Sequence, residues 1–390
     1  MVVGVADGVG LGIVRDLGRE GVPVLAVGSD ARATALLSRF CVAARCHDPR
    51  YEEEAWLDDM ERIGAALPQR AVLFPAFDDY VWALSRHAER LEDYYLLPFA
   101  RWDVMRRLAD KEEQIRAAWR AGTDTPRTCF VHGPDDLRDA AREVPFPALF
   151  KPLRHQEMRR RFGFKVVLVP TLGDLASAYE KASPCGSLML QEVVPGGDEE
   201  FYTYGAYHDA SSRPLGRFIS RKVRQHPRLY GESRIAESLW VEDVAAAAEG
   251  LLGELSFHGI SGTEFKRDPR DGRLKLMEVN ARNWLHGRLA TAAGVNLSYV
   301  AYRDAIGHPF AAPKQDDGVR WTDLVHDGPD SLGEIRRGEM RPAAWLASFR
   351  GVRVDSLLSL RDPVPGLAEV RRMAARHLRR RFARQAAPEA

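Results

Sequence analysis

The sequence is poor in cysteine and has no long apolar run. Its four cysteines, Cys41, Cys46, Cys129 and Cys185, form no CxxC pair and show no His/Cys spacing typical of a metal site. We therefore expect reduced thiols, not a disulfide framework or a zinc site. No apolar run is long enough to span a bilayer, and the first residues lack the basic-then-apolar pattern of a signal peptide. A cytoplasmic protein is the expectation.

Net charge is also nearly absent. A formal charge of +1 over 390 residues gives no overall attraction to nucleic acid or to an acidic partner. The remaining composition, 45% hydrophobic and 28% charged, is that of a soluble globular protein, and the length favours two or three domains. The carboxyl end departs from this balance, with a helical pattern that carries Arg371, Arg372, Arg376, Arg379, Arg380, Arg381 and Arg384.

The first 30 residues have the pattern of a strand, a glycine loop, a helix and a second strand. Met1–Ala6 and Val22–Val27 are predicted strands, and Ile13–Glu20 has helical spacing. The loop is predicted at Gly8, Gly10 and Gly12. Such a βαβ unit is typical of doubly wound sheets. The spacing is G-x-G-x-G, not the G-x-G-x-x-G of dinucleotide sites, so a tight strand-to-helix turn is favoured over NAD or FAD binding.

A further strand is predicted at Ala71–Pro75, followed by a helix at Tyr80–Leu91. Asp78 and Asp79 lie between them, where sheets of this class place ligand-facing loops. These aspartates either contact a substrate or cap the helix, and capping is the simpler interpretation.

The most informative stretch is a predicted hairpin at residues 260–282. Its turn, at 268–272, contains Asp, Pro and Gly. Side chains alternate along a strand, so Glu278 and Asn280 share a face, and Glu264 on the first strand can face the same space. Two carboxylates and an amide oxygen suit a Mg²⁺ ion that also takes phosphate oxygens. The alternative is a surface hairpin with solvated acids.

Cationic side chains occur on other predicted strands. Lys151 closes the short apolar strand Ala148–Pro152, where an ammonium group needs a phosphate or a carboxylate as partner. Lys222 and Arg224 stand two residues apart on a strand and are expected to share a face. They either bind phosphate or a substrate carboxylate, or belong to an exposed basic strand.

Seven stretches, in order, resemble the ATP-grasp superfamily, and in particular its branch of ATP-dependent carboligases that includes D-aspartate ligases. They cover residues 108–284: LADKEEQ, TPRT, ALFKP, LQEVVPGGDEEF, RKVRQHP, GTEFKRDPRDG and LMEVNARNW. The resemblance implies a fold of mixed α/β and α+β class. A Rossmann-like domain at 1–98 would precede a two-lobed ATP-grasp domain at 99–312 with a hinge near 191–196. A C-terminal extension at 313–390 would end in the basic helix.

The resemblance also implies site residues. Lys111 and Lys151 match lysines that neutralise nucleotide phosphates, and Arg282 matches a position that steadies the γ-phosphate or an acyl phosphate. The hinge that binds adenine through its backbone matches Gln191, Glu192, Val193 and Val194. The ribose acids match Glu199 and Glu200, and the metal ligands match Glu264, Glu278 and Asn280. Lys222 and Arg224 are expected to be catalytic residues together with Arg282, because they could bind the transferred phosphate or the substrate carboxylate.

The loop after Lys151 departs from the superfamily. Many members carry a lid rich in glycine and serine there, whereas this chain has RHQEMRRRFGFK with Gly163 as its single glycine. Basic side chains, Lys165 among them, either replace backbone amides on the phosphates, bind an acidic acceptor, or are solvated.

The implied activity is an ADP-forming carboxylate–amine ligase that uses ATP with Mg²⁺, or Mn²⁺ in its place, and forms an amide or peptide bond through an acyl phosphate. The alternative is an ATP-binding regulatory or scaffold protein of the same fold. Expected partners are a small carboxylate and an amine, with an amino acid or peptide first, and a second copy in a homodimer. The basic helix adds the alternative of an anionic membrane or a lipid-linked substrate. Nucleic acid is not expected.

Overall fold

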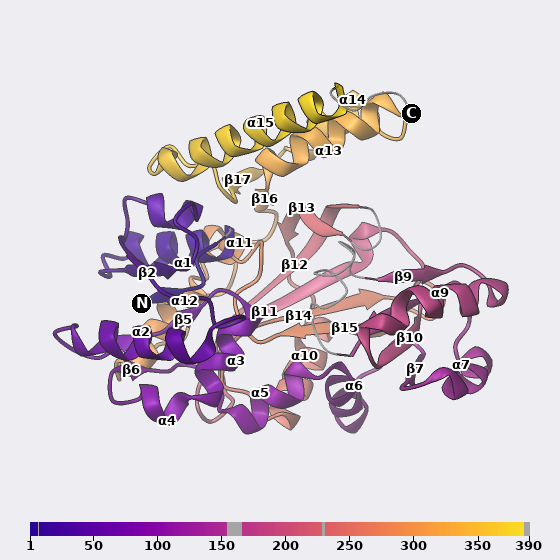
Figure 1. Ribbon diagram of the computed structural model, residues 1–390, viewed down its shortest axis with the longest axis horizontal. Helices are drawn as coiled ribbons and strands as arrows, with labels where there is room; N and C mark the ends of the chain where they lie inside the picture. Colours follow the sequence, from indigo (N-terminus) through magenta and orange to yellow (C-terminus); the bar gives the residue numbers. More distant parts are fainter. Residues whose placement is uncertain (7, 154–165, 228–230, 386–390) are drawn as a thin grey trace.

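The computed structural model describes the chain apart from residues 7, 154–165, 228–230 and 386–390 (Figure 1). Within these described residues the strands form sheets of four, four, seven and two strands. The four cysteines are free thiols, as predicted. Among the helices of the described part, none combines the length and apolar character needed to cross a membrane.

The first sheet is parallel, in the order β3-β2-β1-β5. Its strands are β1 (Val2–Val3), β2 (Leu25–Gly28), β3 (Val42–Arg45) and β5 (Phe74–Pro75). Its helices are α1 (Gly8–Arg19), η1 (Thr34–Leu37), α2 (Glu53–Ala65), α3 (Asp78–Arg86) and α4 (Ala88–Leu91). The predicted βαβ unit is confirmed. The predicted strand at 71–75 is divided, because β4 (Ala71–Val72) pairs with β6 (Tyr95–Leu96) in a separate sheet.

The predicted glycine loop is wrong, because the three glycines lie inside the first turns of α1. They allow close packing of the helix and not a loop conformation. A Cβ atom on Gly10 would lie 2.7 Å from the Cα atom of Val5, and one on Gly12 would lie 3.0 Å from Cγ of Arg288. The helix therefore rests directly on the chain that leaves β1.

This packing predicts opposite effects for two glycine substitutions in helices. Gly10→Ala should lower the free energy of unfolding by about 1–3 kcal/mol, because the added methyl group meets backbone. Gly250→Ala should raise it by about 0.5–1 kcal/mol, because Gly250 is exposed in a helix and has no atom within 4 Å of the added Cβ. Urea denaturation of both variants measures the difference, and equal effects would contradict the packing of α1.

The second sheet is antiparallel, in the order β7-β10-β8-β9. Its strands are β7 (Thr128–Val131), β8 (Ala148–Pro152), β9 (Val167–Val169) and β10 (Leu188–Glu192). Its helices are η2 (Pro134–Asp136), α7 (Leu137–Glu143), η3 (Leu172–Asp174), α9 (Leu175–Ala182) and η4 (Ser183–Cys185). This small sheet has a hydrophobic core of its own, around Phe150 and Leu190, and lies at the right of Figure 1.

The third sheet has seven strands in the order β15-β14-β11-β12-β13-β16-β17. They are β11 (Phe201–His208), β12 (Pro214–His226), β13 (Glu232–Ser238), β14 (Gly259–Arg267), β15 (Leu274–Asn280), β16 (Arg320–Thr322) and β17 (Val352–Asp355). Its neighbours along the chain are α5 (Trp102–Ala109), α6 (Lys111–Arg120), η5 (Asp198–Glu200), α10 (Glu242–Glu254), α11 (Arg288–Ala292) and α12 (Leu297–Ala305).

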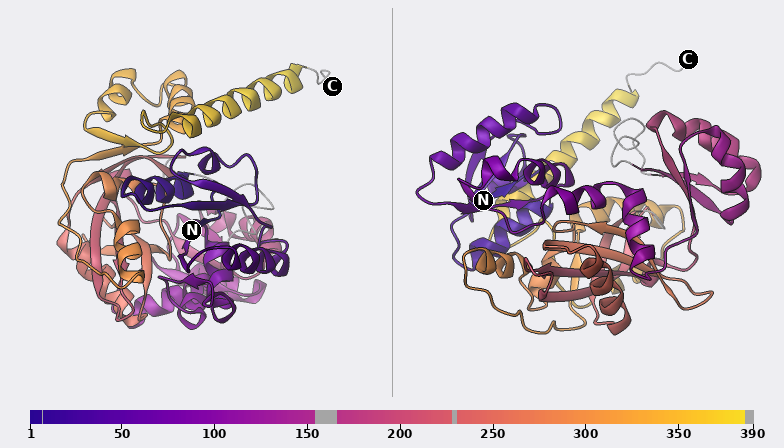
Figure 2. Two further views of the ribbon diagram at one scale, coloured as in Figure 1. Left: turned by 90° about the vertical axis from the view of Figure 1, so that its left-hand side faces the viewer. Right: turned by 90° about the horizontal axis from the view of Figure 1, so that it is seen from below.

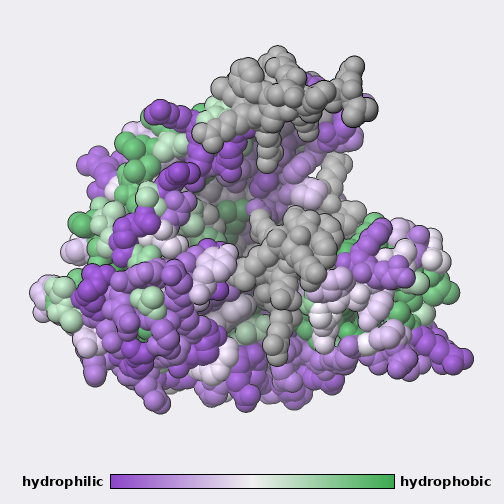
Figure 3. Space-filling model, viewed as in Figure 1, coloured by the Kyte–Doolittle hydropathy of each residue, from purple (hydrophilic) through white to green (hydrophobic). Residues whose placement is uncertain are grey.

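The first sheet and the large sheet share their hydrophobic cores. One cluster joins Val3 of β1 to Tyr204 of β11, and another joins Val2 of β1 to Tyr207 of β11. The small sheet, with its separate core, stands apart from this body. Figure 3 shows the surface in the same view as Figure 1, with this body at the left and the small-sheet part at the right.

The last segment joins both parts of that body. It supplies β16 and β17 to the large sheet and then α13 (Leu324–Arg336), α14 (Pro342–Ser348) and α15 (Pro363–Gln385). Asp362, at the start of α15, accepts hydrogen bonds from Arg15 (2.9 Å), Ser38 (2.8 Å) and the backbone of Arg39 (3.0 Å). This contact fixes α15 beside the first sheet (Figure 2). We propose three domains, at residues 1–98, 99–312 and 313–390. The third domain supplies β16 and β17 to the large sheet of the second.

Candidate active site

The predicted hairpin is confirmed as β14 and β15. Glu264 lies directly opposite Glu278 in the register, and Asn280 lies opposite Gly262. The turn closes with a hydrogen bond from Asp268 N to Arg273 O (2.9 Å). Because residues opposite each other in an antiparallel pair point to the same face, Glu264, Glu278 and Asn280 share one face of the large sheet.

The two opposed carboxylates repel each other unless cations lie nearby. Lys222 Nζ lies 3.0 Å from Oε2 of Glu264, and Lys111 Nζ lies 3.8 Å from Oε1 of Glu278. The two glutamate side chains are 23% and 30% exposed, so solvent reaches the acids while the lysines lie deeper, at 7% and 15%. The two carboxylates therefore lie nearer to solvent than the two ammonium groups that neutralise them.

Lys111 and Lys151 come from different parts of the chain. Lys111 begins α6, which Asp110 caps by accepting hydrogen bonds from Glu112 N (2.9 Å) and Glu113 N (3.3 Å). Lys111 N itself donates to Leu153 O (3.2 Å), which ties the start of α6 to the end of β8. This contact brings the two lysines together.

Lys151 projects from β8 of the small sheet, and its Nζ donates to Gln191 Oε1 (2.8 Å). Burial, together with the charge of Lys111, lowers the pKa of Lys151 to about 8 against the opposing effect of Glu278 and Glu264. These charges interact across the space between the small and the large sheet. A polyanion placed there would neutralise both lysines.

The lowered pKa of Lys151 predicts a pH-dependent affinity for ATP. Below pH 8 the side chain is largely an ammonium group, whereas above pH 8 it must take up a proton before it can neutralise phosphate. ATP affinity should therefore be full near pH 7 and fall by up to about tenfold per pH unit above pH 8. Titration calorimetry from pH 7 to 9 measures this, with Lys151→Met as the control that should give weak, pH-independent binding. A flat profile for the parent protein would contradict the assignment.

Arg282 is held by a residue of the first domain. Its Nε and Nη2 atoms bind Oδ1 and Oδ2 of Asp78, each at 2.8 Å, and Nη2 lies 3.5 Å from Asn280 Oδ1. The prediction that Asp78 or Asp79 caps the helix is wrong, because α3 begins at Asp78 and the residue at its cap, Phe77, makes no side-chain capping bond. Asp78 instead orients the arginine at the end of the hairpin.

Lys222 and Arg224 do not share a face. Lys222 pairs with Ala236 and Arg224 with Ile235, so a bulge between them turns the two side chains to opposite sides of the sheet. Lys222 remains at Glu264, whereas Arg224 binds Asp327 of α13 at 2.6 Å. The predicted placement of Arg224 beside Lys222 is therefore wrong. The sequence contains no glycine or proline that marks this bulge.

Comparison with known proteins was made by sequence and by structure. No family model matches the chain. D-aspartate ligase of Enterococcus faecium is 22% identical over 255 residues, 62% of this chain and 60% of that protein. Formate-dependent phosphoribosylglycinamide formyltransferase of Ignicoccus hospitalis is 26% identical over 249 residues, 57% of this chain and 56% of that protein. The chain thus spans less than two thirds of the length of these curated relatives.

Solved structures match more of the chain. The ADP complex of N5-carboxyaminoimidazole ribonucleotide synthetase has a TM-score of 0.67 at 14% identity, covering 86% of this chain and 84% of the other. L-amino acid ligase from Bacillus licheniformis has a TM-score of 0.60 at 17% identity, covering 79% and 74%. Both are ATP-grasp enzymes. The chain has the ATP-grasp fold. Its small and large sheets, β7-β10-β8-β9 and β15 to β17, face each other across Lys151 and the hairpin.

The end of β10 and the connection that follows it hold the remaining predicted residues that the structure describes. Gln191 links Lys151 to Thr128 Oγ1 (2.8 Å), and the backbone of Val193 donates to Pro147 O (2.9 Å). Glu199 and Glu200 lie in η5, directly after the predicted hinge. Asp198 beside them accepts hydrogen bonds from the side chain (Nε2, 2.8 Å) and the backbone N–H (3.0 Å) of Gln225. Lys165 and the basic loop 154–165 lie outside the described residues.

The residues on the hairpin fit a magnesium site. Two carboxylates and one amide oxygen are hard oxygen donors on a single face, and they leave room in an octahedral shell for phosphate oxygens and water. Their repulsion also favours a cation between them. The sequence pattern predicted this donor set and singled out Asp78, but it did not indicate that Asp78 pairs with Arg282. It gave no signal for Lys266 and Arg270, which contact the predicted hinge.

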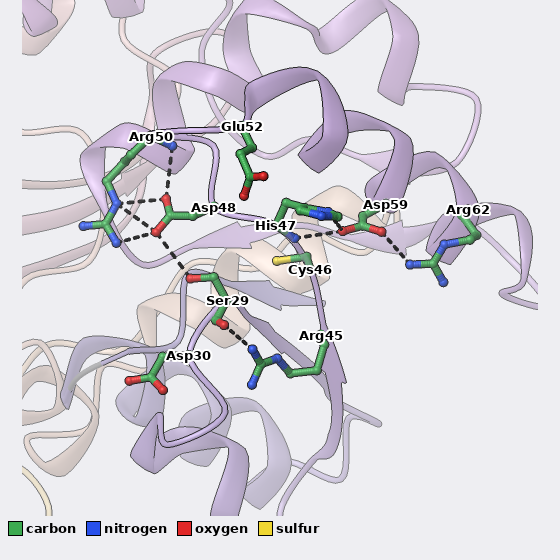
Figure 4. Close-up of a pocket in the computed structure, with 10 residues that line it drawn as sticks. All are labelled: Ser29, Asp30, Arg45, Cys46, His47, Asp48, Arg50, Glu52, Asp59 and Arg62. Carbon is green, nitrogen blue, oxygen red and sulfur yellow. Dashed lines mark hydrogen bonds and ion pairs between the residues drawn. The ribbon is translucent and has the colours of Figure 1, made fainter.

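A separate cavity of about 670 Å³ lies at the carboxyl ends of β2 and β3 (Figure 4). Parallel sheets place ligands at this edge. Its walls are paired charges: Asp48 with Arg50, and Asp59 with both His47 (2.7 Å) and Arg62 (2.6 Å). No motif in the sequence indicates these residues.

Proposed function

We propose that the protein is an ATP- and Mg²⁺-dependent ligase that joins a carboxylate to an amine and releases ADP and phosphate. The observation that carries this proposal is the meeting of Glu264 and Glu278 with Lys111, Lys151 and Lys222 between the two sheets. The ATP-grasp fold and the names of the relatives, which include two amino-acid ligases, support it.

In this mechanism Glu264, Glu278 and Asn280 would hold the metal, which supplies charge neutralisation to the transferred phosphoryl group. Lys111 and Lys151 hold the phosphate chain from the small-sheet side. Their fixed ammonium groups stabilise negative charge without solvent reorganisation.

Arg282, oriented by Asp78, faces the end of the hairpin where the substrate carboxylate would take up the phosphoryl group. The amine then attacks the carbonyl carbon of the acyl phosphate, the C–O bond to phosphate breaks and phosphate leaves, and the nitrogen gives up a proton as the amide bond forms. Lys222, at Glu264, is placed to bind the departing phosphate.

An amino acid is the proposed carboxylate or amine. Two of the matched proteins are named for joining amino acids, D-aspartate ligase and L-amino acid ligase. The cations at the site suit an α-carboxylate, and the charge pairs of the first-domain cavity offer both signs for a zwitterion. The choice of amino acid is a matter for experiment.

Phosphate release from MgATP tests the proposal. Pools of D- and L-amino acids, combined with pools of small amines and dipeptides, are added to the protein, and ADP and phosphate are counted. We expect release that needs one acid and one amine and yields ADP and phosphate in equal amounts. Binding of ATP without release from any pool would favour the alternative of an ATP-binding regulatory protein.

A further inference from the structure

The chain that leaves β10 carries backbone groups that the sheet does not use. Within the described residues, the carbonyl groups of Glu192 and Val193 and the N–H group of Val194 have no backbone partner. Glu192 N donates to Arg127 O (2.9 Å), so the ladder would return Arg127 N–H to the carbonyl of Glu192. It goes instead to the side chain of Glu192, at Oε1 (2.9 Å).

The side chain of Glu192 thereby keeps its own carbonyl group free. The Glu192–Val193 peptide is fixed from the other side, where Val193 N donates to Pro147 O (2.9 Å). Because a trans peptide points its C=O and N–H in opposite directions, the carbonyl of Glu192 faces away from Pro147. The free acceptor thus has a defined direction.

The next fixed peptide is the one after Val194. Lys266 Nζ binds the carbonyl oxygens of Val194 (2.8 Å) and Gly196 (3.0 Å). Lys266 is 2% exposed and stands two residues after Glu264 on β14, so one strand carries both a proposed metal ligand and this contact. The peptide between Val193 and Val194 lies between two fixed neighbours.

The β14–β15 turn completes the support. Arg270 Nη2 lies 3.0 Å from Oε2 of Glu192, and Arg270 Nε lies 2.9 Å from Oδ1 of Asp268. Glu192 therefore uses one oxygen for Arg127 N–H and the other for Arg270. A buried carboxylate with both oxygens engaged has little freedom to turn toward its own backbone.

We propose that Glu192, Lys266 and Arg270 are positioning residues that hold a backbone edge open for a 6-aminopurine. The inference rests on the proposed ATP site. The edge presents an acceptor, the carbonyl of Glu192, and a donor, the N–H of Val194, on the same side of an extended chain. Adenine offers the complement, a donor at N6 and an acceptor at N1. Guanine offers the reverse and is rejected.

The test compares ATP with purine riboside triphosphate, which lacks the 6-amino group, by titration calorimetry in the presence of Mg²⁺. The parent protein should bind ATP about tenfold more tightly than the analogue, the value of one well-placed hydrogen bond. Glu192→Gln keeps an oxygen for Arg127 N–H and should retain most of this preference. Glu192→Leu frees Arg127 N–H to bind the carbonyl of residue 192, and the preference should fall to about one.

Two further variants and one control variant guard against a folding defect. Arg270 is about half exposed, so Arg270→Gln should fold and should reduce the preference for ATP about threefold. Lys266→Met should also reduce the preference for ATP, whereas Arg267→Met, at the next residue of β14, should leave it unchanged because the parent side chain binds Asp243 of α10. In the control Arg267→Met the turnover number at saturating ATP should stay within about threefold of the parent's, because this substitution leaves base recognition unchanged.

Two outcomes would overturn the inference. An unchanged preference in both Glu192→Leu and Arg270→Gln would mean that these side chains do not position the edge, while the ATP site itself would stand. Failure of the parent protein to bind ATP at all would overturn the proposed function and this inference with it. The parent measurement therefore separates the two failures.

Discussion

Glu278→Gln should abolish Mg²⁺-dependent ATP turnover, by about a thousandfold or more, and should leave the unliganded protein at least as stable as the parent. The loss follows because a metal that bridges phosphates contributes several kcal/mol to the transition state, and Glu278 is one of its two anionic ligands. The gain in stability follows because Glu264 and Glu278 are opposed in register, and like charges in that position cost about 0.2–1 kcal/mol.

The result is informative because turnover and stability are expected to change in opposite directions. Phosphate release measures turnover, and thermal melting without nucleotide measures stability. Glu237→Gln is a matched control, since Glu237 lies in the same sheet but pairs with Arg221 and Arg320; it should lose stability and keep turnover. Normal turnover by Glu278→Gln would remove the hairpin from the mechanism, and lost turnover with a lowered melting temperature would indicate unfolding.

Arg282→Ala should lower the turnover number by about a hundred- to a thousandfold while changing ATP affinity little. Arg282 Nη2 lies 3.5 Å from Asn280 Oδ1 at the end of the hairpin, where charge would develop on the acyl phosphate, and removal of one such donor has an effect of this size. Asp78→Asn tests its orientation separately. The amide keeps one oxygen but loses the bidentate ion pair, so the turnover number should fall about tenfold with Arg282 still present.

Steady-state kinetics with MgATP and the identified acid and amine measure both variants. The double variant should be no worse than Arg282→Ala alone, because Asp78 acts through the arginine. Additive losses would show that Asp78 contacts substrate independently. A raised KM for ATP with an unchanged turnover number would place Arg282 in nucleotide binding only.

Local patterns predicted most of the strands that build the site. The apolar run at 148–152, the hairpin at 260–282 and the two glutamates on its facing strands follow from alternation and turn chemistry, and the structure has them in register. The hinge and the phosphate lysines needed the resemblance to a known family, because no short-range rule assigns a lysine to a phosphate.

The failures have a common cause, which is contact with distant segments. The glycines of α1 have a spacing that suits a loop, yet Val5 and Arg288 require their small size inside a helix. The bulge that turns Arg224 toward Asp327 depends on how β12 pairs with β13. No residue at that point of β12 predicts a bulge. Asp78 and Arg282 are 204 positions apart in the sequence, so neither sequence neighbourhood contains the other residue of the pair.

The measurement that tests the central claim most directly is titration calorimetry of the parent protein with ATP, once with Mg²⁺ and once with a chelator. Our account predicts one site per chain whose affinity falls by at least about tenfold when the metal is removed, because the opposed glutamates then face the phosphates unshielded. Equal affinity with and without metal would contradict the assignment of Glu264, Glu278 and Asn280 as its ligands, and no binding in either condition would contradict the ATP site itself.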